Sequence, residues 1–318
     1  MVDGHRGGVM ALEIKHLLGL KNVSKKDINL ILDHADNFYE VLQRDIKQVP
    51  TLRGKTVVNL FYENSTRTKM SFELAEKRLT ASPLNFSASG SSVSKGETLK
   101  DTIQNIEAMK IDMVVVRHGG AGVPLFLTKC TDAIIINAGD GFHEHPTQAL
   151  LDMMTIRQHF GKLEGLKVAI VGDILHSRVA RSNAWGMKTM GMEVTLCGPN
   201  TLIPQHPESL GVKVTSSMSE AIENADVVMM LRLQLERQGS GLTPSVREYR
   251  ELYGMDLDKL ATIPEHAIIM HPGPINRGIE LASNVADSDR AVILNQVTNG
   301  VAVRMAVLYL LGGGQDHA

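Results

Sequence analysis

Short apolar runs that alternate with stretches of helical periodicity constrain the fold of this chain more than any other feature. Short runs without polar alternation are typical of strands that are buried on both faces. Their alternation with helices predicts βαβ units and therefore parallel sheets. The expected strands are Val57–Phe61, Leu84–Phe86, Met113–Val116, Ile134–Ile136, Val168–Val171, Val194–Cys197, Val227–Leu231 and Ile268–Met270.

These eight strands fit two sheets of four or five strands better than one, and 318 residues are enough for two domains. We expect an α/β fold with two domains, 1–150 and 151–294, each a mostly parallel sheet flanked by helices. The divide falls in a helix that begins at His145-Pro146 and ends near Gly161. Near the start of the chain, Ser24 and Asp27 form a weak variant of the capping box that opens an amphipathic helix.

Composition excludes several classes of protein. The net charge of −2 argues against a general nucleic-acid surface, and no apolar run is long enough to span a bilayer. Cys130 and Cys197 are too few for a disulfide framework, so a reduced, cytoplasmic setting is expected.

The turn after the first strand predicts a phosphate site. A helix N-terminus presents unpaired N–H groups and partial positive charge, and hydroxyl and guanidinium groups add donors. The alternative is a well-capped helix with a surface arginine. In the helix itself, the candidate inward positions are Met70, Phe72, Leu74, Ala75 and Leu79. The donors of the turn are Ser65, Thr66, Arg67 and Thr68.

Further polar residues follow the next strands, where ligands collect in open α/β sheets. The loop Ser89–Glu97 could deliver Lys95 to an anion or could be a solvated linker. Arg117 leaves a buried strand and must reach an anion or solvent, because an unpaired buried charge is costly.

A proline at the first helical position makes His145 the expected N-cap of the next helix, with Gln148 on the same face. The histidine could donate to a carbonyl oxygen, and the glutamine carbonyl could meet an amide group. A capping histidine without a ligand is the alternative. His143 lies nearby, but neither histidine has a partner at ligand spacing, so no metal site is expected.

In the second half, the segment after Gly172 lacks the glycines of GxGxxG, which disfavours a dinucleotide cofactor. Arg178 near the helix start favours an anionic group instead. Arg232 and Gln234 lie on one side of an extended strand, although a charged connector would look the same. His271-Pro272-Gly273-Pro274 forms a rigid turn whose carbonyls could be ligands, or a bare turn.

Seven segments, taken in order, resemble those of the aspartate/ornithine carbamoyltransferase family, and its aspartate branch in particular. They are FYENSTRTKMSFELA, SVSKGET, the RH strand end, HPTQALLD, GDILHSRVARS, LRLQLER and HPGPINRG. The resemblance runs from about Leu12 to Leu311. The Cys-bearing HCLP segment usual in ornithine enzymes is absent. Two departures are Ser94, where some relatives carry a second lysine, and Gly273, where some carry leucine.

The resemblance implies carbamoyl transfer from carbamoyl phosphate to L-aspartate, without cofactor or metal. It implies a carbamoyl-phosphate domain at 1–150, on which a C-terminal helix of about 295–311 packs, and an aspartate domain at 151–294. It also implies a homotrimer with shared active sites, and a regulatory chain or a dihydroorotase is a possible partner. The rival functions are transfer to another amine such as ornithine, nucleotide-dependent dehydrogenation, and non-enzymatic binding.

The resemblance also implies a role for each candidate residue. Ser65, Thr66, Arg67 and Thr68 would hold the phosphate. Arg117 and His145, assisted by Thr66, would contact the carbamoyl oxygen, and Gln148 the carbamoyl nitrogen. Arg178, Arg232 and Gln234 would bind the aspartate carboxylates, and Pro272 and Gly273 would supply backbone contacts. Ser91 and Lys95 would enter from the adjacent subunit.

Overall fold

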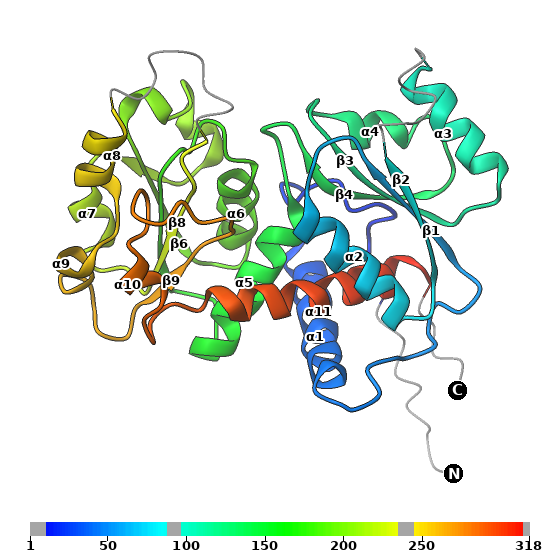
Figure 1. Cartoon of the computed structure of the whole chain (residues 1–318), viewed down its shortest axis with the longest axis horizontal. Coiled ribbons are helices and arrows are strands. Elements are labelled where there is room, and N and C mark those ends of the chain that lie inside the picture. The colour runs from blue at the N-terminus through cyan, green and yellow to red at the C-terminus, as the bar shows by residue number, and fades with distance from the viewer. Residues whose placement is uncertain (1–10, 88–96, 235–244, 314–318) are drawn as a thin grey trace, which may run out of the picture.

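The computed structural model describes residues 11–87, 97–234 and 245–313, and it consists of two α/β units side by side (Figure 1). The expected α/β class with two mostly parallel sheets is confirmed. Every strand pairing within the two sheets is parallel. The carboxyl ends of the strands of each sheet therefore lie along one edge, where polar side chains from different loops can meet.

The first sheet has the strand order β2-β1-β3-β4. Val, Ile and Leu fill most buried positions of three of its strands, whereas β2 at the edge is largely exposed. The strands are β1 (Thr56–Phe61), β2 (Ser82–Ser87), β3 (Met113–His118) and β4 (Ile134–Asp140), and the helices that connect them are α2 (Thr66–Arg78), α3 (Leu99–Ala108) and α4 (Val123–Leu127).

The second sheet has the order β7-β6-β5-β8-β9. Its strands are β5 (Lys167–Val171), β6 (Glu193–Cys197), β7 (Lys213–Thr215), β8 (Val227–Met230) and β9 (Ile268–Met270). Its helices are α6 (Arg178–Thr189), α7 (Met218–Ile222), α8 (Val246–Tyr253), α9 (Leu257–Leu260) and α10 (Ser283–Ala286), with 3₁₀ turns at Asn200–Leu202 and Pro207–Leu210. Eight of the nine strands in the described part of the chain were expected, and β7 was missed because this short edge strand has no apolar run.

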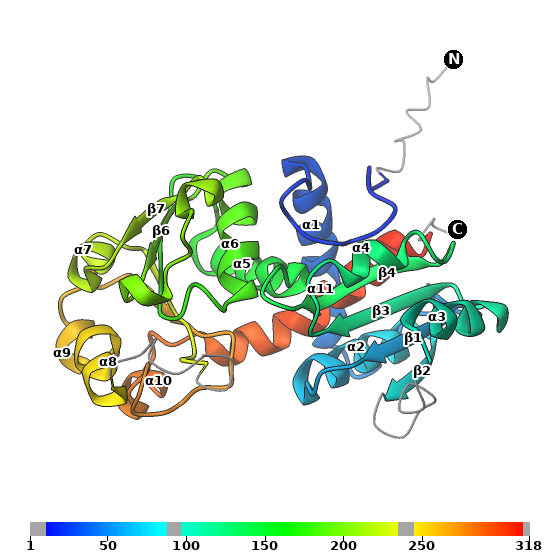
Figure 2. The ribbon, with the colours of Figure 1, turned by 90° about the horizontal axis from the view of Figure 1, so that it is seen from above.

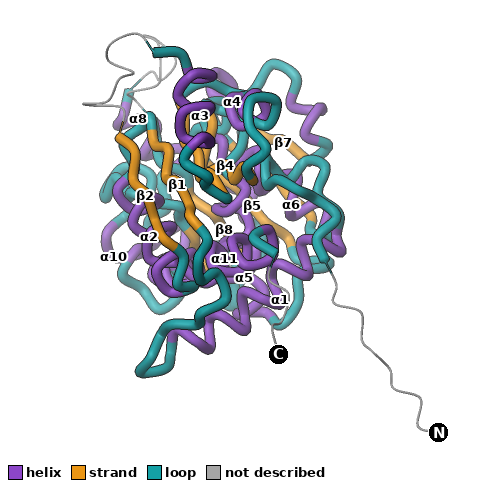
Figure 3. The backbone as a smooth tube through the Cα atoms, turned by 90° about the vertical axis from the view of Figure 1, so that its right-hand side faces the viewer, coloured by secondary structure: helices purple, strands orange, loops and turns teal. Residues whose placement is uncertain are grey.

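Three long helices pack against one another. These are α1 (Lys25–Leu42), α5 (Pro146–Phe160) and α11 (Ile293–Leu311). The last helix leaves the second sheet at β9 and crosses to the first unit, where it packs on α1, α2 and α5 (Figures 1 and 2). Apolar residues of α5 and α11 belong to one core cluster together with strand residues of both sheets. Figure 3, which faces the first unit, shows the first sheet in front and strands of the second behind it.

Local details agree with the sequence except on one helix face. The hydroxyl of Ser24 accepts a hydrogen bond from the backbone N–H of Asp27, as the capping pattern predicts. In α2, however, Met70 and Leu74 are not inward, since they are 63% and 39% exposed. These two residues are one turn apart, so they share the outer face of the helix.

Candidate active site

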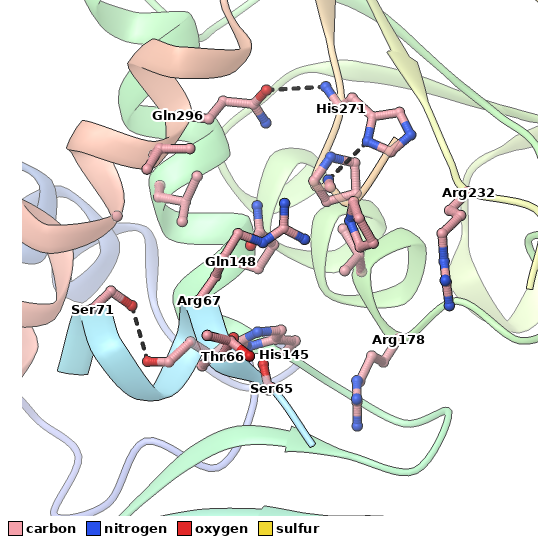
Figure 4. Close-up of a pocket in the computed structure, with 18 of the residues that line it drawn as sticks. Ser65, Thr66, Arg67, Ser71, His145, Gln148, Arg178, Arg232, His271 and Gln296 are labelled. Carbon is pink, nitrogen blue, oxygen red and sulfur yellow. Dashed lines mark hydrogen bonds between the residues drawn. The ribbon is translucent and has the colours of Figure 1, made fainter. Parts of the chain in front are cut away.

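A cavity of about 630 Å³ lies between the two units, and it is lined by residues that follow strands of both sheets (Figure 4). β1, β3 and β4 contribute from the first sheet, and β5, β8 and β9 from the second. Polar residues that follow strands of the two sheets therefore meet at one cavity. Of the candidate residues, the lining includes Ser65, Thr66, Arg67, Thr68, Arg117, His145, Gln148, Arg178, Arg232, Gln234, Pro272 and Gly273. Ser91 and Lys95 lie outside the described residues.

The turn before α2 opens into this cavity. Ser65 is the N-cap residue, but its side chain makes no capping hydrogen bond, so the hydroxyl is not consumed by the helix. Arg67 reaches across to the Pro272–Pro274 turn of the second unit. At Gly273, where φ is +65°, a Cβ atom would lie 2.1 Å from Nη1 of Arg67. Glycine therefore lets the arginine come close to this turn.

The cavity carries concentrated positive charge. Partial desolvation by the walls, and then repulsion from Arg232, lowers the pKa of the Arg67 guanidinium. Arg232 and Gln234 both line the cavity, whereas Leu233 between them is buried in the second core. Gln234 donates from Nε2 to the carbonyl oxygen of His176 at 3.2 Å. A dianionic substrate would relieve the repulsion between the two arginines.

His145 is the N-cap of α5, and Pro146 occupies the first helical position, as expected. Its backbone N–H donates to Oγ of Ser182 at 2.8 Å, which holds the residue against α6. The imidazole is almost fully buried, and burial lowers its pKa well below 6.5, with further lowering by three arginines that include Arg117 and Arg178. The ring is therefore neutral at physiological pH and can donate one N–H without adding charge.

Glu63 contacts two arginines of the cavity lining, and the sequence did not reveal this role. Its Oε2 lies 2.8 Å from Nη2 of Arg178 and 3.5 Å from Nε of Arg117. The carboxylate thus joins an arginine of each unit, and Gly139 makes room for them, because a Cβ there would lie 3.0 Å from Arg178 and 3.1 Å from Arg117. Its position just before Asn64, in the turn for which the sequence predicts a phosphate site, was the one available signal.

Two further lining residues, Gln296 and Arg304, come from α11 and were also missed. The available signal was that Gln296 and Arg304 are buried polar positions of a mainly apolar helix, a pattern that Asn299 shares. Gln296 accepts from the backbone N–H of His271 through Oε1 at 3.0 Å (Figure 4). Gln148 donates from Nε2 to Asp152 at 2.9 Å, which leaves its carbonyl end for the cavity.

The described parts of the chain contain no group of three or more His, Cys, Asp or Glu side chains that could hold a metal ion. His143 instead pairs with Oδ2 of Asp140 at 3.1 Å. Among the same described segments, there is no helix with the length and apolar character needed to cross a membrane.

Comparison with known proteins follows the same division of the chain. Residues 15–158 match the model of the aspartate/ornithine carbamoyltransferase carbamoyl-P binding domain, and residues 164–311 match that of the Asp/Orn binding domain. The aspartate carbamoyltransferase catalytic subunit of Citrifermentans bemidjiense is 59% identical over 307 residues, which cover 96% of this chain and 99% of that protein.

Solved structures are similar over nearly the whole chain. The aspartate transcarbamoylase of Trypanosoma cruzi, in complex with carbamoyl aspartate and phosphate, is 30% identical with a TM-score of 0.84, over 92% of this chain and 95% of that one. The ornithine carbamoyltransferase of Pyrococcus furiosus is 28% identical with a TM-score of 0.83, over 97% and 100%. Since both enzymes share the fold, the fold alone does not select the acceptor. Its two matched domains and its full-length relatives show that this chain belongs to the aspartate/ornithine carbamoyltransferase family.

Proposed function

We propose that this protein is an aspartate carbamoyltransferase. It transfers the carbamoyl group of carbamoyl phosphate to the α-amino group of L-aspartate, giving N-carbamoyl-L-aspartate and phosphate, a step of de novo pyrimidine biosynthesis. The observation that carries the proposal is one cavity with a phosphate-type turn on one wall and Arg178, Arg232 and Gln234 on the other. Relatives at 57–59% identity named aspartate carbamoyltransferase catalytic subunit support the same acceptor.

At the carbamoyl-phosphate end, the N–H groups that open α2, the hydroxyls of the turn and Arg67 bind the phosphate. Arg117 and the neutral His145, with the Thr66 hydroxyl, donate to the carbamoyl oxygen. The carbonyl of Gln148 accepts from the carbamoyl NH₂ group, which is supported by the orientation that Asp152 imposes on the amide. Backbone groups of Pro272 and Gly273 complete the contacts.

At the other end, Arg178, Arg232 and Gln234 bind the two carboxylates of aspartate. Two guanidinium groups suit a dicarboxylate and repel the cationic side chain of ornithine. Glu63 holds Arg178 beside Arg117. The acceptor carboxylate on Arg178 then lies next to the carbamoyl group that the acceptor amine attacks. This arrangement supports aspartate over ornithine as the acceptor.

In the reaction, the aspartate amine attacks the carbonyl carbon of carbamoyl phosphate, a C–N bond forms, and a tetrahedral oxyanion develops. The C–O bond to phosphate then breaks, and the leaving phosphate accepts the amine proton. Arg67, Arg117 and His145 oppose the growing negative charge, so the chain supplies position and electrostatic stabilisation rather than a nucleophile.

We assign carbamoyl phosphate to a domain of residues 1–150, with the helix of about 295–311 packed on it, and aspartate to a domain of residues 151–294. The packing of α11 on α1 and α2 supports this assignment. The polar lining of each half of the cavity supports it as well.

The active form in this proposal is a cytoplasmic homotrimer in which Ser91 and Lys95 enter the site of the adjacent subunit. Its relatives are named catalytic subunits, which is consistent with a regulatory chain or a dihydroorotase as a further partner. Neither nucleic acid nor a membrane takes part in the reaction.

One assay separates the two acceptors. The purified protein is incubated with carbamoyl phosphate and either L-aspartate or L-ornithine, and carbamoylated product and phosphate are both quantified. We expect product with aspartate and little with ornithine. Product with ornithine alone would reassign the acceptor, and no product from a folded oligomer with either would favour a binding protein.

Subunit mixing tests the shared site. Arg67→Ala and Lys95→Ala proteins, each nearly inactive, are dissociated, mixed and reassociated. Hybrid trimers should regain activity, because some sites then receive both native residues. If mixing is verified with tagged subunits and activity stays absent, Lys95 acts within its own chain.

A further inference from the structure

Asp152 lies at the centre of a hydrogen-bond network behind the cavity wall. It is on α5, one turn after Gln148, and its side chain is fully buried. Its Oδ1 accepts from Gln148 Nε2 at 2.9 Å and from Gln296 Nε2 at 2.8 Å. Its Oδ2 accepts from Asn183 Nδ2 at 2.8 Å. One carboxylate therefore receives three carboxamide groups, from α5, α11 and α6.

An ionised carboxylate can only accept hydrogen bonds, so each of these amides must turn its NH₂ group toward Asp152. Burial raises the pKa of Asp152 to about 6, while the three hydrogen bonds and the positive charge of Arg304 act in the opposite direction. The group is thus mainly ionised at neutral pH. For Gln148, which lines the cavity, the consequence is that its carbonyl oxygen is left for the cavity.

The second amide, Gln296, connects Asp152 to a turn on the other side of the cavity. With its NH₂ group on Asp152, Gln296 presents Oε1 to the backbone N–H of His271, at 3.0 Å. His271 begins the turn that lines the cavity, and its Nδ1 in turn accepts from the backbone N–H of Gly273 at 2.8 Å. Asp152 is therefore connected to this turn through two successive hydrogen bonds.

The third amide connects Asp152 to the helix that Arg178 begins. Asn183 lies on α6 and is fully buried, and its Oδ1 has no hydrogen-bond partner among the described residues. With asparagine at position 152, Asn183 could reverse its amide without losing a bond at Oδ1, at the cost of the contact between its Nδ2 and Sδ of Met229 at 3.6 Å. In the native protein, a reversal of any of the three amides would set an amide oxygen against the Asp152 carboxylate.

We propose that Asp152 is a positioning residue that orients the Gln148 amide and the 271–274 turn together, and so aligns groups from both units on the carbamoyl end of the substrate. It touches no substrate itself and acts through Gln148 and Gln296. The proposal rests on the carbamoyl transfer assigned above. The added point is that the cavity linings from both units are oriented by one buried carboxylate, that of Asp152.

The experiment compares Asp152→Leu, which removes both acceptor oxygens at similar volume, with Asp152→Asn, which keeps one. Asparagine can accept from both glutamines while Asn183 reverses to accept its new NH₂ group. The kcat and the KM of each substrate are measured for the full-length protein. We expect kcat/KM to fall ~100-fold in Asp152→Leu, the scale of a site displaced by about 1 Å, and less than ~10-fold in Asp152→Asn.

A double-mutant cycle with Gln148→Ala separates positioning from a general loss of packing. If Asp152 acts through Gln148, then Asp152→Leu lowers kcat/KM for carbamoyl phosphate much less in the Gln148→Ala background than in the native one. If the two substitutions lower kcat/KM by independent factors that multiply in the double mutant, the proposal is overturned. Native kinetics in Asp152→Leu would overturn it as well. If Asp152→Leu does not fold, the cycle is run with Asp152→Ala, which also removes both acceptor oxygens, and is judged by the same criterion.

Glu76→Gln is the control, since it replaces another fully buried carboxyl group, one that lies outside the cavity lining. Its kinetic constants should equal those of the native protein. Failure of the native protein to carbamoylate any acceptor would refute the assigned reaction. If the protein is active but the double-mutant cycle shows no coupling between Asp152 and Gln148, only the role of Asp152 is refuted and the assigned reaction stands.

Discussion

Replacing Glu76 with glutamine tests the charge state of a carboxyl group buried between α2 and β1. Glu76 has no exposed surface, and its Oε2 accepts from Asn59 Nδ2 at 2.8 Å. Its Oε1 has no hydrogen-bond partner within the described residues. Burial raises the pKa of this carboxyl group from 4.5 to about 8, and the neighbouring charge of Glu73 also raises it. Folded protein at neutral pH therefore holds a proton here that unfolded protein has released.

The sign of the effect on stability follows from proton linkage. Because the folded state binds the extra proton between pH 4.5 and about 8, the contribution of Glu76 is fully present below pH 4.5 and is lost as pH rises through about 8. At about 1.4 kcal/mol per pH unit, the loss between pH 6 and pH 8 is about 3 kcal/mol per chain. Glutamine keeps the volume and an acceptor for Asn59 but cannot ionise, so this pH dependence should disappear.

The assay is reversible urea unfolding of the native and Glu76→Gln proteins at pH 6 and pH 9. Groups common to both proteins cancel in the difference between their free energies of unfolding. We expect Glu76→Gln to gain about 3 kcal/mol relative to the native protein from pH 6 to pH 9. Glu107→Gln on α3 is the control, since hydrogen bonds from the Thr131 side chain and the Asp132 backbone lower the pKa of Glu107, so that it stays ionised from pH 6 to pH 9 and its difference should stay constant. A Glu76→Gln difference constant to about 0.5 kcal/mol would refute a protonated Glu76.

Three further predictions concern the cavity. Arg67→Ala should lower turnover ~10²–10³-fold with native circular dichroism, since one preorganised donor to the developing charge is lost, and near-normal turnover would exclude that role. Glu63→Gln should raise the KM for aspartate about tenfold in steady-state assays, because Arg178 and Arg117 lose their shared carboxylate, and an unchanged KM would show that the ion pairs do not position the arginines. His145→Ala should lower kcat ~10²-fold, while the pH–rate profile from about pH 6 to 9 keeps its shape, because the pKa of the buried His145 already lies below this range. A lost acid limb in that mutant would show instead that His145 titrates in this range.

Local patterns in the sequence were enough for the fold class and for the order of the elements. Eight apolar runs identified eight strands, and the Ser24 and His145-Pro146 patterns marked helix starts, because capping and burial on both faces act over a few residues. Strand β7 escaped because an edge strand of three residues needs no apolar run. The outer position of Met70 and Leu74 depends on which face of α2 the sheet covers, and hydrophobicity alone did not reveal it.

The sequence by itself also identified most side chains of the candidate site, because each stands at the end of a strand and parallel strands end along one edge. Only the tertiary structure decided what those side chains do to one another. Glu63 meets Arg178 across 115 residues of sequence, and Asp152 meets Gln296 across 144. Such contacts arise from the packing of α5, α6 and α11 between the units, which no local pattern encodes. The charge states of His145 and Glu76 follow from the same packing, because burial sets the cost of ionisation.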